Sequence, residues 1–244
     1  MIGSSHVGSG ADCQDSCLAL VETAPAGEPL LVVFVADGAG SALHGGDGAE
    51  LAVATAADFI SGQLAEPGFA LGPDLAAACV RHVREQIEAL AEVRGLVPRD
   101  FAATFLGVLA SAAGTLAMQI GDGGIVLDFG QGLELPIVPM AGEYANMTYF
   151  ITDPDAPEML ATHFRPVTAC KVAVFSDGLQ RLALNLSSNT PHEPFFTPFF
   201  SRLTNLGDDQ EEQFQSGLVN FLGSATINER TDDDKTLALA VLLE

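Results

Sequence analysis

The hydrophobic pattern near the N-terminus predicts two strands followed by two helices. Residues 16–22 and 29–37 form the strands, which are joined by a turn rich in Ala, Pro and Gly, and the second strand is apolar enough for a sheet interior. Apolar residues then recur at helical spacing over residues 47–64, and Pro73 opens a second helix that runs to about Val93. Both helices are rich in Ala and apolar on one side, which favours packing on a sheet.

The middle of the chain returns to strand-like segments that are separated by glycine-containing turns, as in an antiparallel meander. These predicted strands cover residues 101–110, 115–120 and 125–129. Residues 130–168 hold scattered Pro, Gly and Asp with weak periodicity, which indicates an irregular cover or flap. A buried strand over 170–175 follows, and a short helix is expected from Ser176 through Leu184.

The C-terminal part contains a predicted loop, a helix and a closing strand. Residues 185–202 are polar and then aromatic, and we interpret the Phe cluster as packing for a loop. Residues 208–222 form a helix with acidic residues in its first turn, and residues 236–243 form the strand. Because strands group around helix pairs without a βαβ repeat, the fold class is α+β with layered sheets and helices.

Composition and charge limit the possible functions. The 244 residues can bury one substantial core, so a single domain over 1–244 is expected. Ten Lys and Arg against 32 Asp and Glu give a formal net charge of −22, which argues against binding to nucleic acid or to an anionic membrane. With no signal-like segment and no apolar run long enough to span a bilayer, a cytoplasmic protein is the default expectation.

The four cysteines do not form a metal-binding pattern. Cys13 and Cys17 are separated by three residues and have no second pair, and Cys79 and Cys170 stand alone. We therefore expect buried free thiols.

Three aspartates share a position at the end of a predicted strand. Asp37 and Asp177 end buried strands, and Asp233 immediately precedes the closing strand. If these strand ends converge, three carboxylates would repel one another severely without bound cations. Oxygen ligands of this kind favour Mg²⁺ or Mn²⁺ over zinc.

Glycines follow two of these aspartates directly. Gly38 and Gly178 permit backbone conformations that are closed to other residues, and Gly38 leaves its carbonyl free to face a cation. Since Asp-Gly is also a common turn pair, the inference of a metal site depends on the whole set of aspartates.

Six short motifs occur in an order that resembles the type 2C metal-dependent protein phosphatases. They are Gln14-Asp15, the run from Ala36 to Ser41, Ala103-Thr104, Gly121-Asp122-Gly123, Ser176-Asp177-Gly178 and the run from Asp233 to Thr236. The resemblance implies a four-layer α-β-β-α sandwich, in which two stacked antiparallel sheets are flanked by antiparallel helix pairs.

The resemblance also implies the roles of the site residues. Asp37 would bridge two cations, Asp177 and Asp233 would complete the protein ligands of the first, and the Gly38 carbonyl would help to hold the second. Asp15 would act beside them, directly or through water. A hydroxide held between the two cations would then attack the phosphorus of phosphoserine or phosphothreonine in a protein substrate, with a Ser/Thr kinase as the opposing enzyme.

Several positions depart from the family pattern. Gln14 stands where many members carry an acidic residue, and Ala39 stands where a His often donates a proton to the leaving group. His44 is the nearest histidine in the sequence that could replace this proton donor. The favoured interpretation, however, is that His44 is a partly exposed residue at the start of a helix. The usual phosphate-binding Arg has no counterpart, and His6 is a remote substitute.

A third cation site is also implied, at Asp122 together with Asp177. In the family a further acidic residue completes that site. Arg181 stands at its position in this chain, and a guanidinium opposes cation binding. Arg181 could instead replace the missing phosphate clamp.

Three functions fit these residues. The leading one is a metal-dependent protein serine/threonine phosphatase. The alternatives are a pseudophosphatase that binds phosphoproteins or partners without turnover, and a hydrolase of small phosphate esters. Retention of the three aspartates favours the first, because a buried carboxylate cluster is costly without cations.

Overall fold

The computed structural model describes residues 1–10, 12–140, 148–207 and 209–243. Five antiparallel strands form its larger sheet, in the order β1-β2-β3-β4-β7. The bounds of these strands are Asp15–Thr23 for β1, Pro29–Asp37 for β2, Phe105–Ser111 for β3, Gly114–Ile120 for β4 and Ala161–Arg165 for β7. Strands β3 and β4, both in the interior of this sheet, are buried along their whole length.

A second antiparallel sheet has the order β11-β8-β5-β6. Its strands are β5 (Gly124–Asp128), β6 (Leu133–Glu134), β8 (Lys171–Phe175) and β11 (Leu237–Val241). Strands β9 (Leu184–Asn185) and β10 (Thr190–Pro191) pair with each other as a separate two-stranded sheet. Aliphatic residues of the two sheets form one buried cluster that includes Val33, Val108, Ile125 and Val174, so the sheets are stacked face to face.

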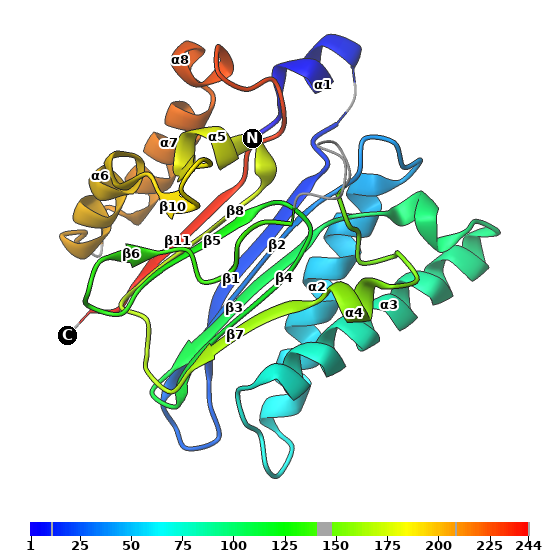
Figure 1. Ribbon diagram of the computed structural model, residues 1–244, viewed down its shortest axis with the longest axis horizontal. Helices are drawn as coiled ribbons and strands as arrows, with labels where there is room; N and C mark the ends of the chain where they lie inside the picture. Colours follow the sequence, from blue (N-terminus) through cyan, green and yellow to red (C-terminus); the bar gives the residue numbers. More distant parts are fainter. Residues whose placement is uncertain (11, 141–147, 208, 244) are drawn as a thin grey trace.

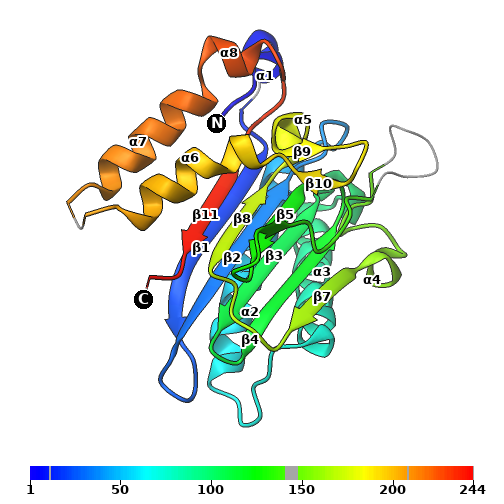
Figure 2. The ribbon, with the colours of Figure 1, turned by 60° about the vertical axis from the view of Figure 1, so that its left-hand side comes forward.

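Helix pairs cover the two outer faces of the stacked sheets (Figures 1 and 2). On one side, α2 (Gly45–Leu64) and α3 (Pro73–Arg94) form a buried cluster with the larger sheet. On the other side, α6 (Glu193–Thr204) forms a cluster with the smaller sheet, and α7 (Glu211–Leu222) contacts α6 through Phe221. The predicted four-layer α+β sandwich is therefore confirmed.

The remaining elements are short. They are α1 (Ser4–Ser9), η1 (Pro98–Phe101), α4 (Ala156–Met159), η2 (Asp177–Leu179), α5 (Gln180–Ala183) and α8 (Ala225–Asn228). Within the described residues, no helix is both long and apolar enough to cross a membrane.

The loop predicted over 185–202 is wrong, because residues 193–204 form helix α6. Its phenylalanines are spaced for one helical face, and Pro194 occupies the first turn, where a proline is tolerated. Phe196 is fully buried and packs on Phe175 of β8, with ring centroids 5.9 Å apart. The aromatic cluster belongs to a covering helix and not to a loop.

The irregular cover predicted over 130–168 is also partly wrong. Residues 161–165 form β7, an edge strand whose residues are all at least partly exposed, so its sequence lacks the apolar run of a buried strand. Residues 141–147 of this predicted cover lie outside the described residues. Among the other boundaries, the strand predicted from Phe101 begins only at Phe105, because Pro98–Phe101 turns as a 3₁₀ helix.

The cysteines are free thiols of unequal exposure. Cys79 is buried, as predicted, and burial raises the pKa of its thiol to about 12. Cys17 is exposed, so the expectation of burial is wrong there; it lies on β1 in a strand that is only half covered.

Candidate metal centre

Strand ends from both sheets meet at one end of the sandwich and bring the predicted aspartates together. Asp15 and Asp37 are direct partners across β1 and β2. Asp177 follows β8 and Asp233 precedes β11, and these two strands are antiparallel neighbours. A cavity of about 190 Å³ lies at this end, and its lining includes Asp37, Gly38, Asp122, Asp177 and Asp233.

The Ala103-Thr104 motif fixes the backbone of Asp37. The Asp37 N–H donates to Thr104 Oγ1 at 3.0 Å, and the Thr104 N–H donates to the Asp37 carbonyl at 2.8 Å. Gly38 in turn donates its N–H to the Gln14 carbonyl at 3.1 Å. These bonds tie β1, β2 and the start of β3 around one carboxylate.

Ser176 connects the two sheets at the site. Its hydroxyl donates to Asp15 Oδ2 at 2.7 Å and accepts the Thr236 N–H at 3.0 Å. The carboxylate of Asp15, from β1 of the larger sheet, is thereby held against the two strands of the smaller sheet that lead to Asp177 and Asp233.

The two Asp-Gly glycines are required by close packing, and not by an unusual backbone conformation as the sequence had indicated. Neither Gly38 nor Gly178 is among the glycines with positive φ. A Cβ at Gly38 would collide with the backbone of Gly45 at the start of α2, and one at Gly178 would collide with the carbonyl of Asp234. Gly178 therefore lets the backbone that carries Asp177 touch the backbone that carries Asp233.

Burial and mutual repulsion shift the carboxyl groups toward their protonated forms. Burial, and then the charges of Asp15 and Asp177, raise the pKa of Asp37 well above its ordinary value. Burial and the charge of Asp122 raise the pKa of Asp177 to about 6. The pKa values of Asp15 and Asp122 are raised as well, in both cases chiefly by burial.

These carboxylates fit divalent cations. Asp15 Oδ1, Asp177 Oδ1 and Gln14 Oε1 are buried and have no hydrogen-bond partner among the described residues, and such oxygens are strong candidates for a missing ligand. Among those residues, no three His, Cys, Asp or Glu side chains are already grouped as a cation site. The charge of Asp177 is one of the causes that raise the pKa of Asp37, so bound cations would offset a repulsion that protonation otherwise relieves.

Asp122 and Arg181 take different places relative to the cavity. Asp122 lines it and accepts a hydrogen bond from Thr148 Oγ1 at 2.6 Å, while its charge acts on Asp177. Arg181 is exposed on α5 and lies outside the described lining of the cavity. Asp122 therefore faces the cavity without the Arg181 guanidinium beside it in the described lining.

His44 lies at the start of a helix, as the sequence predicted. It caps the N-terminus of α2, with Nδ1 3.4 Å from Asp47 and its ring stacked on Phe101. It lines a neighbouring cavity of about 430 Å³, which also contains Gln14 and Asp15.

Three residues that line the cavity beside the aspartates were missed or undervalued in the sequence. Thr148 and Phe150 come from the segment predicted as an irregular cover, and His6 comes from α1. No motif marks any of them. His6 was considered only as a remote substitute, because nothing in the sequence shows that residue 6 returns to the C-terminal strand.

Comparisons with known proteins agree with this arrangement. Residues 2–223 match the family model described as Protein phosphatase 2C. Over 243 residues the chain is 51% identical to serine/threonine-protein phosphatase 3 of Escherichia coli (strain K12). The match covers 100% of this chain and 96% of that protein.

Solved structures of similar fold include two serine/threonine phosphatases. The catalytic domain of the serine/threonine protein phosphatase PstP, in complex with two manganese ions, has a TM-score of 0.63 at 18% identity, over 96% of this chain and 93% of that chain. Stp1 from Staphylococcus aureus has a TM-score of 0.61 at 14% identity, over 96% and 90% of the two chains. At these identities the likeness concerns the fold.

Proposed function

The chain belongs to the protein phosphatase 2C family, and we propose that it hydrolyses phosphoserine and phosphothreonine in proteins with the help of bound Mg²⁺ or Mn²⁺. The observation that carries this proposal is the convergence of Asp37, Asp122, Asp177 and Asp233 on one cavity. The raised pKa values of Asp37, Asp122 and Asp177, together with the unpartnered Oδ1 of Asp177, support a site whose acidic groups are completed by cations.

The ligand assignment that we propose is the one that the resemblance to the type 2C phosphatases implies for these residues. Asp37 would contact two cations, Asp177 and Asp233 one of them, and the Gly38 carbonyl the other, with Asp15 acting directly or through water. Asp122 would hold a third cation with Asp177. Two bound cations would supply a hydroxide for in-line attack on phosphorus and would neutralise charge on the phosphoryl oxygens.

The chain's own residues orient this site and shape what enters it. Thr104 holds the Asp37 backbone, and Ser176 holds Asp15 against the smaller sheet. Thr148 and Phe150 form the part of the described lining that comes from the segment between the sheets. The proposed substrate is a phosphorylated protein. An opposing Ser/Thr kinase would attach the phosphate to that protein.

The test is hydrolysis of p-nitrophenyl phosphate and of a phosphothreonine peptide, with Mn²⁺, with Mg²⁺ and with chelator. Asp37→Asn should lower kcat/KM by roughly 10³-fold, since several kcal/mol of charge stabilisation depend on the cations. Asp58→Asn is the matched control, because Asp58 is exposed on α2. Activity that survives both chelation and Asp37→Asn would refute the metal-dependent mechanism. Mn²⁺ binding without any turnover would instead support the pseudophosphatase.

A further inference from the structure

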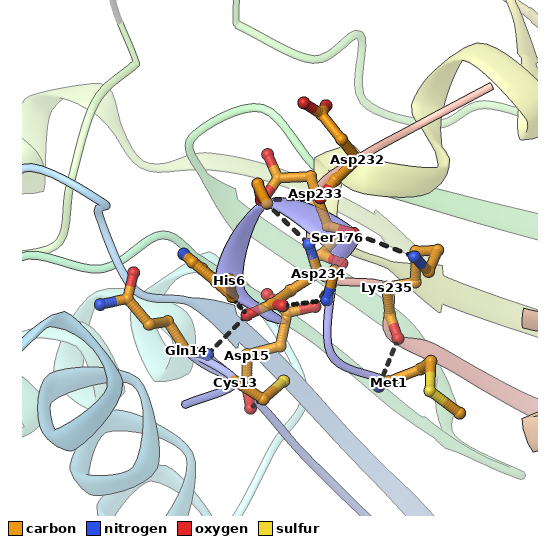
Figure 3. Close-up of polar contacts among 12 residues, drawn as sticks. Met1, His6, Cys13, Gln14, Asp15, Ser176, Asp232, Asp233, Asp234 and Lys235 are labelled. Carbon is orange, nitrogen blue, oxygen red and sulfur yellow. Dashed lines mark hydrogen bonds and ion pairs between the residues drawn. The ribbon is translucent and has the colours of Figure 1, made fainter. Parts of the chain in front are cut away.

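Different hydrogen bonds hold different parts of the metal cavity. Beside Asp233, the carboxylate of Asp234 accepts the Gln14 N–H at 2.6 Å, as Figure 3 shows, and also the Gly3 N–H at 2.6 Å. These contacts bind the loop before β11 to the N-terminal segment. A second part of the lining comes from residues 148–153, which we call the wall segment, and its position depends on other bonds.

The wall segment contributes two residues to the cavity lining. Thr148 Oγ1 donates to Asp122 Oδ2 at 2.6 Å, so this hydroxyl orients a carboxylate that lines the cavity. Phe150 has the largest apolar side chain in the described lining. A Cβ at Gly121 would lie 3.0 Å from the Tyr149 carbonyl, so the segment lies against the turn that carries Asp122. The position of the wall segment therefore determines both the orientation of Asp122 and the apolar part of the lining.

An arginine of α3 binds the backbone of the wall segment. Arg84 Nη1 donates to the carbonyl oxygens of Ile151 and Asp153, in both cases at 2.5 Å. The Arg84 side chain is 16% exposed, and Ile151 is buried in the cluster that α2 and α3 form with the larger sheet. Nη2 lies 4.0 Å from Glu88, an exposed ion pair that contributes little. The two charge-assisted bonds from Nη1 therefore join the wall segment to α3.

The other hydrogen bonds that join the wall segment to described residues elsewhere in the chain are few. The Ile151 N–H donates to the Ala103 carbonyl at 2.9 Å, and Thr148 donates to Asp122. Ala103 takes part in a β-bridge at the strand ends of the site, so this contact is made to the sheet itself. Without Arg84, the N–H of Ile151 would remain bound while the carbonyl oxygens at 151 and 153 would lose their donor.

Arg84 acts on the cavity only through the wall segment. It lies outside the described lining, so its guanidinium does not meet a phosphate group there. A shift of the wall segment would turn Thr148 away from Asp122 and would withdraw Phe150 from the lining. Asp37 would keep its place, because its position depends on β2 and on bonds to the start of β3. Loss of Arg84 should therefore change the wall of the cavity and leave the strand-end aspartates in position.

We propose that Arg84 is a positioning residue for substrate binding, which places Thr148 and Phe150 in the wall of the metal cavity by binding the wall segment. This inference rests on the proposed function, because it concerns how a phosphate ester is held in that site. The wall contacts the substrate before and during the reaction alike. Its loss therefore weakens binding more than it slows the chemical step.

Steady-state kinetics with p-nitrophenyl phosphate and saturating Mn²⁺ test this role. Arg84→Met removes the donors and keeps an apolar stem; it should raise KM about threefold to tenfold and change kcat by less than about twofold. Thr148→Val should also raise KM. The double variant should have nearly the KM of Arg84→Met alone, because a displaced Thr148 no longer reaches Asp122. Arg81→Met, at an exposed position on α3, is the matched control and should leave KM unchanged.

Tyrosine fluorescence reports directly on the wall segment. The chain contains no Trp and two Tyr, so Tyr144→Phe leaves Tyr149 as the only tyrosine. Tyr149 is partly buried against the cluster of α2, α3 and the larger sheet. In the Tyr144→Phe background, Arg84→Met should raise acrylamide quenching of Tyr149 roughly twofold, since the segment opens locally, and Arg81→Met should not. Acrylamide is uncharged, so the net charge of −22 does not repel it.

The outcomes separate this inference from the proposed function. If Arg84→Met lowers Tm but leaves KM and quenching unchanged, Arg84 only stabilises the fold and the inference is wrong. Increased quenching with unchanged KM also overturns it, as does a double variant in which the two effects on KM multiply. A wild-type protein that is inert towards every substrate with Mn²⁺ would overturn the proposed function and the role in substrate binding with it. Increased quenching in Arg84→Met would then still support the contact between Arg84 and the wall segment.

Discussion

Replacing Asp177 by Asn should stabilise the protein at neutral pH when cations are removed. Burial and the charge of Asp122 raise the pKa of Asp177 to about 6 in the folded chain, against about 3.9 in an unfolded one. Below pH 3.9 the group is neutral in both states and costs nothing. As the pH rises through about 6, the folded state must accept a charge that the unfolded state already carries, so stability is lost.

The size of this effect follows from the shift. About two pKa units correspond to roughly 3 kcal/mol of unfavourable free energy at pH 7.5. Asn cannot ionise, but weakening the polar interaction between residue 177 and Asp37 costs about 1 kcal/mol. The variant should therefore be more stable than the wild type by about 2 kcal/mol, or roughly 4–8 °C in Tm for a chain of this size.

The assay is urea denaturation at pH 7.5 and pH 4.5 in the presence of chelator. The advantage of Asp177→Asn should be present at pH 7.5 and should vanish or reverse at pH 4.5. Adding Mn²⁺ should then stabilise the wild type more than the variant, because the variant has lost a proposed ligand. A variant that is less stable than the wild type at pH 7.5 in chelator would refute the reasoning.

Asp128 provides a control of opposite sign. Although burial tends to raise its pKa, hydrogen bonds from Lys171 at 2.8 Å and from Gly130 at 2.7 Å lower it. Its ionisation therefore stabilises the folded state above the unfolded pKa, and that stability is lost as the pH falls. Asp128→Asn should destabilise the protein at pH 7.5 and do so less at low pH.

Two further substitutions examine the surroundings of the site. Gly178→Ala should cost about 1–3 kcal/mol and weaken Mn²⁺ binding, because the new Cβ would collide with the Asp234 carbonyl; urea denaturation and Mn²⁺ titration measure both. Gly62→Ala, at an exposed helix position with open space, should stabilise by up to about 1 kcal/mol and is the control. Arg181→Ala should raise KM for a phosphopeptide about two- to fivefold and leave KM for p-nitrophenyl phosphate unchanged, since the exposed guanidinium can reach peptide but lies outside the cavity lining. An unchanged KM for the phosphopeptide would count against that role.

The parts of the site that could be predicted from the sequence share one property. Asp37 and Asp177 each end a buried apolar strand and Asp233 precedes one, so the local pattern marked them as carboxylates at strand ends, and the order of the motifs implied that they belong to one site. The helices α2 and α3 were predictable for a similar reason, because each has a long apolar face.

What the sequence could not show depends on contacts between distant segments or on weak local patterns. β7 is an edge strand with no buried run, and α6 contains Pro198 in its interior, so neither matches the usual signal of its type. The contact between His6 and Asp234 joins residues 228 positions apart. Its only local trace is an acidic residue directly after Asp233, and an acidic pair in so acidic a chain carries little information.

The charge of the cavity determines how its parts depend on one another. Four carboxylates line it, and the described lining contains neither Lys nor Arg, in a chain of net charge −22. A phosphate group would be repelled there, so in the proposed function the cations are needed for substrate binding as well as for attack on phosphorus. Loss of metal should therefore abolish binding and turnover together.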